Sequence, residues 1–115
     1  MIMKEIYYFA YTNLYFKWFS KLDKGYKIII RKAFDDLKKG KTGKLKHLKK
    51  ILYELRLDLG KGIRIYLIQD GNTLIVILNA GDKQTQQRDI DKSEELMEIY
   101  LDLKTRGELE QWLKK

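Results

Sequence analysis

The fold of this chain is decided between Ile51 and Gly71, where the sequence reads ILYELRLDLGKGIRIYLIQDG. Two apolar segments, Ile51–Leu57 and Gly62–Gln69, flank a glycine-containing turn, and a second turn follows at Asp70-Gly71. An Asp-Gly pair between alternating apolar segments is a strong short-range signal for a β-hairpin. The sequence therefore predicts an antiparallel meander of three strands, with Thr73–Asn79 as the third and covered on both faces.

Helices accompany this meander in the predicted fold. Thr12 is a suitable N-cap for a helix to Leu22, whose apolar residues recur at helical spacing. Gly40 ends a second helix. The predicted elements are a first strand (3–9), helices (12–22, 26–39 and 88–103), a basic loop (40–48), the three strands (51–57, 62–69 and 73–79), a polar loop (80–86) and a C-terminal helical turn (107–113). The order β-α-α-β-β-β-α indicates an α+β fold with a mainly antiparallel sheet packed against helices.

Length and composition exclude several classes of protein. At 115 residues the chain is expected to form one domain, 1–115. It has no cysteine and one histidine, which excludes a disulfide scaffold and leaves no ligand cluster, so we expect no metal and no cofactor. No apolar stretch approaches the length of a membrane span, and the N-terminus lacks the apolar segment of a signal peptide. We therefore expect a cytoplasmic protein without a membrane partner.

Positive charge is concentrated in the first half of the chain. Residues 1–60 carry 15 basic and 6 acidic side chains, a net charge of +9, whereas residues 61–115 have a net charge of −1. The densest part holds seven lysines within thirteen residues: Lys38, Lys39, Lys41, Lys44, Lys46, Lys49 and Lys50. Such a cluster attracts polyanions at long range. It indicates nucleic acid or an acidic protein as the partner, with a merely solvated surface as the alternative.

The predicted hairpin also brings charged residues together. Folding the chain about Gly60 places Arg56 opposite Arg64 and Glu54 opposite Tyr66, all on one face of the sheet. Like charges directly opposite each other destabilise a sheet, so the two arginines suggest an anion site with Glu54 as their orienting partner. A surface ladder of Glu–Arg pairs is the alternative that the pairing alone leaves open.

The polar loop after the third strand adds Lys83 beside the two arginines. Three cations at one sheet edge are able to hold a phosphate and to stabilise the extra charge of a transition state. RNA carries its own nucleophile, the 2′-OH, so its cleavage needs positioning, cations and proton transfer but no metal. These residues therefore form a candidate site for metal-independent RNA cleavage.

The same residues carry a resemblance to a known family. The motifs are Glu54-Leu55-Arg56 followed by Asp58, Gly60, Gly62, Arg64 and Tyr66, and then Gly81-Asp82-Lys83 with Gln86, Asp89 and Ile90. Through them, residues 10–95 closely resemble the addiction-module killer proteins, phage-related toxins of the HigB type in the RelE/ParE toxin superfamily. Residues from about 96 to 115 are expected to be a helical extension beyond this resemblance.

The resemblance implies a RelE-like fold and the toxin of a type II toxin–antitoxin system. It implies a ribosome-dependent mRNA endoribonuclease that blocks translation, with the ribosome, mRNA and a cognate helix-turn-helix antitoxin as partners. Arg56, Arg64 and Lys83 match the basic active-site positions of the family, and Asp89 takes the approximate place of its late active-site tyrosine. The usual Gly-Pro-Gly of the family is Gly60-Lys61-Gly62 in this chain.

Two other functions stay open on the sequence alone. A ParE-like toxin would inhibit DNA gyrase by binding, and a basic nucleic-acid-binding module would use only the lysines. His47 is a natural acid or base near neutral pH, although a lone histidine among lysines is more often a solvated side chain. The residues that we expect to bind RNA or the ribosome are Lys41, Lys44, Lys46, His47, Lys49 and Lys50.

Overall fold

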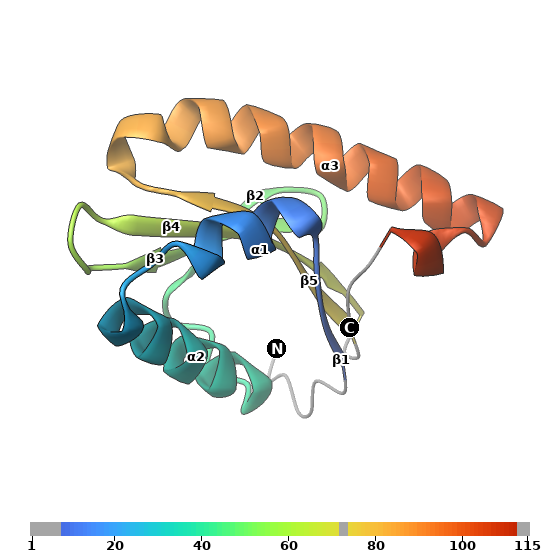
Figure 1. Cartoon of the computed structure of the whole chain (residues 1–115). Coiled ribbons are helices and arrows are strands. Elements are labelled where there is room, and N and C mark those ends of the chain that lie inside the picture. Colours follow the sequence, from blue (N-terminus) through green and yellow to red (C-terminus); the bar gives the residue numbers. More distant parts are fainter. Residues whose placement is uncertain (1–7, 72–73, 113–115) are drawn as a thin grey trace.

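The computed structural model describes residues 8–71 and 74–112, which form three layers (Figure 1). The elements are β1 (Tyr8–Tyr11), α1 (Asn13–Ser20), α2 (Lys24–Lys38), β2 (Leu45–Lys49), β3 (Leu52–Leu57), β4 (Ile63–Asp70), β5 (Leu74–Gly81), η1 (Lys83–Thr85), α3 (Gln86–Arg106) and η2 (Leu109–Gln111). A five-stranded sheet lies between α1 and α2 on one face and α3 on the other. The predicted α+β class is confirmed, and the arrangement is consistent with a RelE-like fold.

The sheet is mainly antiparallel and has the strand order β1-β5-β4-β3-β2. The predicted meander forms, since β3 pairs with β4 and β4 with β5, while β1 joins β5 in parallel. The hairpin register is also the predicted one, with Arg56 opposite Arg64 and Glu54 opposite Tyr66. Six of the eight residues of β5 are buried, so its continuous apolar stretch does indicate a strand covered on both faces.

The predicted basic loop over 40–48 is wrong in its second half. Leu45–Lys49 forms β2, an edge strand that pairs with β3. Leu45 faces α2 and Leu48 faces α3, and a register shift between His47 and Lys49 brings Lys49 opposite Leu52, on the α3 side. Because its two leucines are three residues apart and lie on opposite faces, the segment lacks the two-residue apolar period by which a strand is found in a sequence. The element order is therefore β-α-α-β-β-β-β-α.

The remaining element ends differ from the prediction by a few residues. β1 covers Tyr8–Tyr11 instead of 3–9, and residues 3–7 lie outside the described part of the chain. α3 extends beyond the predicted 88–103 at both ends. The predicted turn 107–113 contains the short η2, with Leu113 outside the described residues.

The predicted capping residues Thr12 and Gly40 lie at the start of α1 and just after the end of α2. The Thr12 Oγ1 accepts a hydrogen bond from the Tyr15 amide (3.2 Å) and donates one to the Leu78 carbonyl (2.6 Å), which ties the start of α1 to β5. Gly40 follows α2 in the left-handed conformation (φ 81°), as predicted for the residue that ends this helix. The Tyr100 hydroxyl of α3 donates a hydrogen bond to Asp70 at the end of β4 (2.6 Å).

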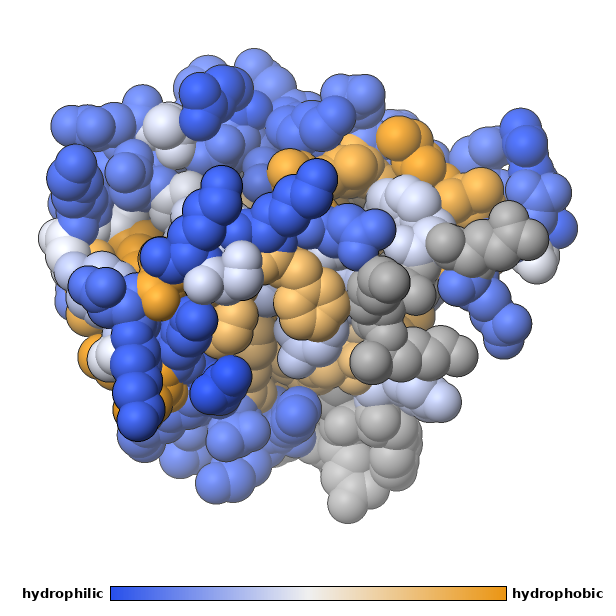
Figure 2. Space-filling model, in the orientation of Figure 1, coloured by the Kyte–Doolittle hydropathy of each residue, from blue (hydrophilic) through white to orange (hydrophobic). Residues whose placement is uncertain are grey.

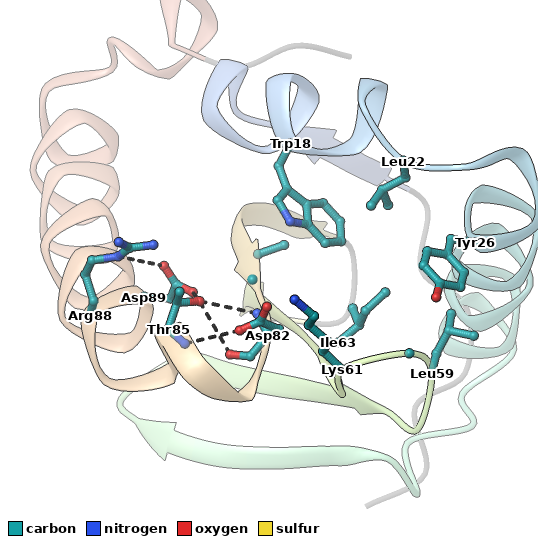
Figure 3. Close-up of a pocket in the computed structure, with 13 residues that line it drawn as sticks. Trp18, Leu22, Tyr26, Leu59, Lys61, Ile63, Asp82, Thr85, Arg88 and Asp89 are labelled. Atoms are coloured by element: carbon teal, nitrogen blue, oxygen red, sulfur yellow. Dashed lines mark hydrogen bonds and ion pairs between the residues drawn. The ribbon is translucent and has the colours of Figure 1, made fainter.

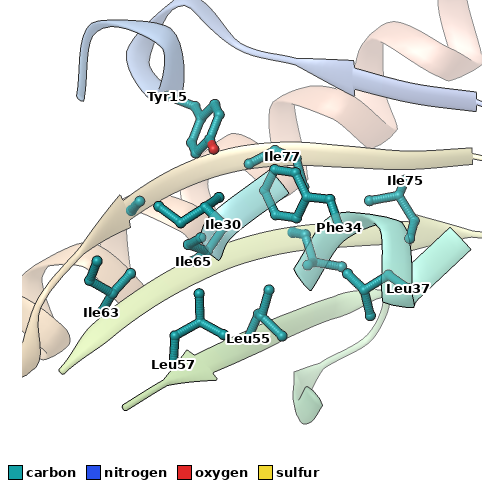
Figure 4. Close-up of a cluster of buried hydrophobic side chains, with 12 residues drawn as sticks. Tyr15, Ile30, Phe34, Leu37, Leu55, Leu57, Ile63, Ile65, Ile75 and Ile77 are labelled. Carbon is teal, nitrogen blue, oxygen red and sulfur yellow. The ribbon is translucent and has the colours of Figure 1, made fainter. Parts of the chain in front are cut away.

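Two hydrophobic cores lie between the sheet and the helices. Tyr15, Ile30 and Phe34 from α1 and α2 pack on the odd-numbered residues of β3 and β4 (Figure 4). On the other face, α3 packs on the even-numbered residues. This second core consists of Ala10, Leu52, Tyr66, Ile68, Val76, Leu78, Leu96, Met97 and Tyr100. Because side chains alternate along a strand, the charged residues at even positions of the hairpin also lie on the α3 face.

The outer surface is dominated by charged and polar side chains. Hydrophilic residues cover most of the face seen in Figure 2, with apolar surface exposed between them. Ile28 and Ile29 of α2 are among the exposed large apolar residues. No helix within residues 8–71 and 74–112 is long and apolar enough to cross a membrane.

Candidate anion-binding site

Five basic side chains surround a groove at the turn end of the central hairpin. β3 and β4 present Arg56 and Arg64 from their even-numbered face, and η1 supplies Lys83. Lys44 and Lys46 extend the groove toward the edge of the sheet. This cationic groove has a volume of about 560 Å³ and is lined by Gly43, Lys44, Leu45, Lys46, Arg56, Asp58, Arg64 and Lys83. The structure thus brings together the three cations that the sequence predicts as a site.

Arg64 is the buried cation of the groove. Only 7% of its surface is exposed, and its Nη1 donates a hydrogen bond to the Ile63 carbonyl (3.3 Å). Its Nε is buried without a hydrogen-bond partner, and no carboxylate of the described residues pairs with it. A buried donor without an acceptor costs about 1–3 kcal/mol, and more when it is charged. An anion that reaches this guanidinium would remove that cost.

Glu54 orients Arg56 from beneath the groove. This carboxylate is fully buried and accepts hydrogen bonds from Arg56 Nε (2.7 Å) and Gln86 Nε2 (2.9 Å). Burial alone would raise the pKa of Glu54, but these hydrogen bonds and the charge of Arg56 outweigh it and lower the pKa. Glu54 therefore stays ionised. Its predicted orienting role is seen for Arg56, whereas Arg64 donates no hydrogen bond to Glu54 in the described structure.

Lys83 lies directly over Gly62. A Cβ at Gly62 would come within 2.8 Å of Lys83 Cε and 2.9 Å of its Cγ, so only glycine leaves room for this side chain. Gly62 also has a φ of 81°, which glycine adopts without strain. The turn that carries Lys83 is fixed by Asp82, whose Oδ1 accepts hydrogen bonds from the amides of Gln84 (2.8 Å) and Thr85 (3.2 Å). Gly62 and the turn that carries Lys83 are therefore both held in place.

Asp58 is the carboxylate on the wall of the cationic groove. It follows β3 directly, is exposed, and forms no ion pair within the described residues although five cations share the groove with it. Glu54 is buried under Arg56, so Asp58 is the acidic group that a ligand in the groove would meet. Asp58 is not among the site residues that the sequence predicts, although its even-numbered spacing from Arg56 predicts the same face of the strand.

Asp89 lies apart from the three predicted cations. It is buried at the start of α3, where it accepts a hydrogen bond from the Thr85 hydroxyl and lies 3.8 Å from Arg88 Nε. Gly81 has no side chain that would collide with this carboxylate. Asp89 lines a separate cleft rather than the cationic groove. The geometry therefore gives it a part in fixing the η1–α3 junction.

The predicted RNA-binding lysines divide between different surroundings. Lys44 and Lys46 line the cationic groove. Lys50 Nζ lies 3.0 Å from Glu98, and Lys49 Nζ lies 3.9 Å from Glu94, so both point to acidic residues of α3. Lys41 Nζ lies 3.9 Å from Asp36. Two of the predicted lysines, Lys44 and Lys46, therefore lie in the same groove as the arginines, whereas Lys41, Lys49 and Lys50 form ion pairs outside it.

His47 faces away from the groove. It pairs with Tyr53 across the β2–β3 ladder, and the two rings lie 5.2 Å apart on the α2 side of the sheet. Its Nε2 is 2.7 Å from the Lys50 carbonyl. Lys46, the residue before it, faces Glu54 on the groove side. His47 is therefore not in a position to act on a ligand bound between Arg56 and Arg64.

Fold and groove together define an α+β protein with a preformed cationic site on one face of its sheet. Residues 17–98 match the family described as phage derived protein Gp49-like (DUF891), and the chain belongs to this family. It is a toxin-like family of the RelE/HigB type, which confirms the predicted resemblance at that level. An uncharacterized protein of Haemophilus influenzae is 38% identical over 81 residues, which cover 69% of this chain and 82% of the relative. No solved structure matches the chain.

Proposed function

We propose that this protein is the toxin of a type II toxin–antitoxin system and that it cuts mRNA on the ribosome without a metal. The single observation that carries the proposal is Arg64, a guanidinium that is 7% exposed, lacks an acceptor for its Nε and lines a groove with four other cations. A groove of this charge suits a strand with several phosphates better than one small anion. Membership of a toxin-like family supports the same function.

In the proposed reaction, Arg64 and Lys83 bind the non-bridging oxygens of the scissile phosphate. The 2′-oxygen of the RNA attacks the phosphorus while Asp58 accepts its proton. The bond from phosphorus to the 5′-oxygen breaks, and this oxygen takes a proton from water, which leaves a 2′,3′-cyclic phosphate and a 5′-hydroxyl. Asp58 then returns its proton to the hydroxide that the water has become. Arg56, oriented by Glu54, adds charge that stabilises the transition state. A guanidinium suits this role because it stays charged and offers several donors in one plane.

The partners follow from the same groove. Lys44 and Lys46 would bind neighbouring phosphates of the message or of ribosomal RNA. The cognate antitoxin is proposed to be a helix-turn-helix protein with acidic surface, because the net charge of +9 in residues 1–60 favours an acidic partner. The proposed site of action is the cytoplasm.

The test is incubation of the purified protein with translating ribosomes and a message whose new 3′ ends are mapped. We expect message shortening by the wild type and by Arg106→Ala, which changes an exposed arginine at the far end of α3, but not by Arg64→Ala. Circular dichroism establishes that all three proteins are folded. Intact messages in cells whose growth stops would contradict the nuclease and favour gyrase inhibition. Binding of RNA without either effect would favour a simple nucleic-acid-binding module.

A further inference from the structure

A second hollow lies at the same end of the sheet, on its other face. This docking cleft has a volume of about 430 Å³ and lies between α1, the start of α2, the β3–β4 turn and the η1–α3 junction. Trp18 points toward Lys61 and Ile63 of the hairpin, and Tyr26 points toward Leu59 at its turn (Figure 3). The cleft and the cationic groove are separated by the hairpin itself, because Ile63 faces one hollow and Arg64 the other.

The floor of the docking cleft is apolar. Trp18, Leu22, Tyr26 and Leu59 are only partly buried, so they leave apolar surface accessible inside the cleft. Ile63 is buried at its base. A cleft of this size takes one or two large apolar side chains, and filling it would remove this surface from water.

The rim of the docking cleft is cationic. Lys61 and Arg88 line it directly. An adjoining hollow shares Trp18, Leu22 and Arg88 with the cleft and adds Lys17 and Lys21. These three lysines are exposed, and within the described residues none of them forms an ion pair. The three lysines therefore offer positive charge that no carboxylate of the described chain neutralises, whereas Arg88 is paired with Asp89.

The polar groups on the η1–α3 side of the docking cleft are hydrogen-bonded to one another. The Asp82 amide donates to Thr85 Oγ1 (3.3 Å), and the Thr85 amide donates to Asp82 Oδ1 (3.2 Å). The Thr85 hydroxyl is hydrogen-bonded to Asp89, which also lies beside Arg88. A nucleobase is recognised through hydrogen bonds to its edges. The cleft thus offers apolar surface and ammonium groups, and the carboxylates of Asp82 and Asp89 that line it are already hydrogen-bonded within the η1–α3 junction.

We infer that the docking cleft binds an acidic peptide segment of a partner protein. One large apolar side chain of the segment enters between Trp18 and Ile63, and flanking carboxylates bind Lys21 and Lys61. The inference rests on the proposed function for its acidic partner, to which it gives a binding site, and it does not depend on RNA cleavage. Because Asp82 and Lys83 are neighbours on opposite sides of one turn, such a partner contacts the element that carries Lys83 without covering Arg64.

The experiment selects short peptides from a displayed library against the whole folded protein and measures their affinity by fluorescence polarisation. We expect enriched peptides to carry a Leu, Ile, Phe or Trp flanked by Asp or Glu. Their affinity should fall on the order of tenfold or more in the double variant Lys21→Glu/Lys61→Glu. It should fall similarly in Leu22→Asp, provided that this variant is folded.

The matched control is Lys32→Glu/Lys39→Glu, which makes the same charge change at two exposed positions of α2 and its C-cap, outside the docking cleft. This control and Arg64→Ala should bind the peptides as the wild type does, within about twofold. The inference is overturned if no peptide is enriched, if enriched peptides lack acidic residues, or if the control loses as much affinity as the cleft variant. Single-stranded RNA whose binding needs Lys21 and Lys61 but not Arg64 would assign the cleft to RNA and overturn it as well.

Discussion

The α3-facing side of the central hairpin has two ends that differ in what covers them. At one end, Leu52 and Ile68 are fully buried under α3 and share a core with Met97. At the other end, Arg56 and Arg64 lie opposite each other and line the cationic groove. The two ends share the same strands and the same register, so strand pairing does not explain the difference. Like charges placed opposite each other weaken a sheet, which indicates that the cationic end serves binding and the apolar end serves folding.

The largest effect is expected from Arg64→Ala, which tests the cationic end. The rate of message cleavage should fall on the order of 10²-fold or more, as it does when a donor to a transition state is lost. The free energy of unfolding should not decrease, because the repulsion from Arg56 is relieved. Mapped cleavage and urea unfolding measure the two quantities, with Arg106→Ala as the control. Cleavage at the wild-type rate by a folded variant would remove Arg64 from the site.

Met97→Ala tests the apolar end and should have the next largest effect. Met97 is fully buried among residues of the second core, so the variant should lose about 2 kcal/mol or more of unfolding free energy. Its cleavage rate per folded molecule should stay close to that of the wild type. Urea unfolding followed by a cleavage assay at low temperature measures both. A fully folded Met97→Ala that has lost cleavage would contradict the division of the hairpin into two ends.

Gly62→Ala tests whether the position of Lys83 in the cationic groove matters, because the variant moves this cation without removing it. The added methyl displaces Lys83 from its place over Gly62, and we expect the cleavage rate to fall by roughly tenfold through misplacement. Gly71→Ala is the matched control, since Gly71 also has a positive φ but a Cβ there meets nothing within 4 Å. Both variants should lose about 1 kcal/mol or more of stability from backbone strain. Equal loss of cleavage in both would show that strain, rather than Lys83, accounts for the change.

Protonation of Glu54 at low pH should change the free energy of unfolding, and we expect this effect to be smaller than those of the three substitutions above. The pKa of Glu54 is lowered in the folded protein, so its contribution to stability is present above the unfolded pKa, near 4.5, and is lost as the pH falls through the lower folded value. Unfolding free energy should therefore decrease more steeply below about pH 4.5 in the wild type than in Glu54→Gln. Urea unfolding over a series of pH values measures this. Parallel pH profiles of the two proteins would contradict the ion pair with Arg56.

The smallest effect is expected in the lysine-rich segment. Neutralising Lys44 and Lys46 should weaken ribosome binding and reduce the slope of log affinity against log salt by about 2, one for each phosphate that the variant no longer binds. Neutralising Lys49 and Lys50 should reduce it by less, because Glu94 and Glu98 already accompany them. Affinity measured over a range of salt concentrations separates the two pairs. Equal slopes for both double variants would mean that the lysines of the groove bind no more phosphates than Lys49 and Lys50 do.

The sequence predicts the central hairpin and its cations well, for a physical reason. A short turn fixes the register of two strands, so the pairing of Arg56 with Arg64 follows from counting residues about Gly60. The motif Gly81-Asp82-Lys83 indicates position 83, and the structure brings it to the same groove. Strand alternation and turn length are therefore enough to predict contacts between residues of one hairpin or of the loop next to it.

Contacts between distant elements are the part that the sequence does not predict. The sequence does not predict β2, because Leu45 and Leu48 are three residues apart and pack on opposite faces of the sheet, so no two-residue apolar period is present. The pairing of Lys49 and Lys50 with α3 depends on how a helix far along the chain crosses the sheet. Asp89 is expected in the site, but the packing of the η1–α3 junction turns it to the docking cleft. Each of these positions depends on tertiary packing, which the periodicity of apolar residues in the sequence does not predict.

The position of β2 at the edge of the sheet has a consequence for solubility. An edge strand exposes backbone groups that are free to pair with another molecule, and such pairing leads to aggregation. Lys46 and Lys49 stand on this strand, and Lys44 and Lys50 flank it, so a second copy that approached the edge would meet its own positive charge. The same lysines therefore protect the sheet from self-association at high concentration. Variants that remove all four should precipitate more readily than the wild type, even where each one folds normally.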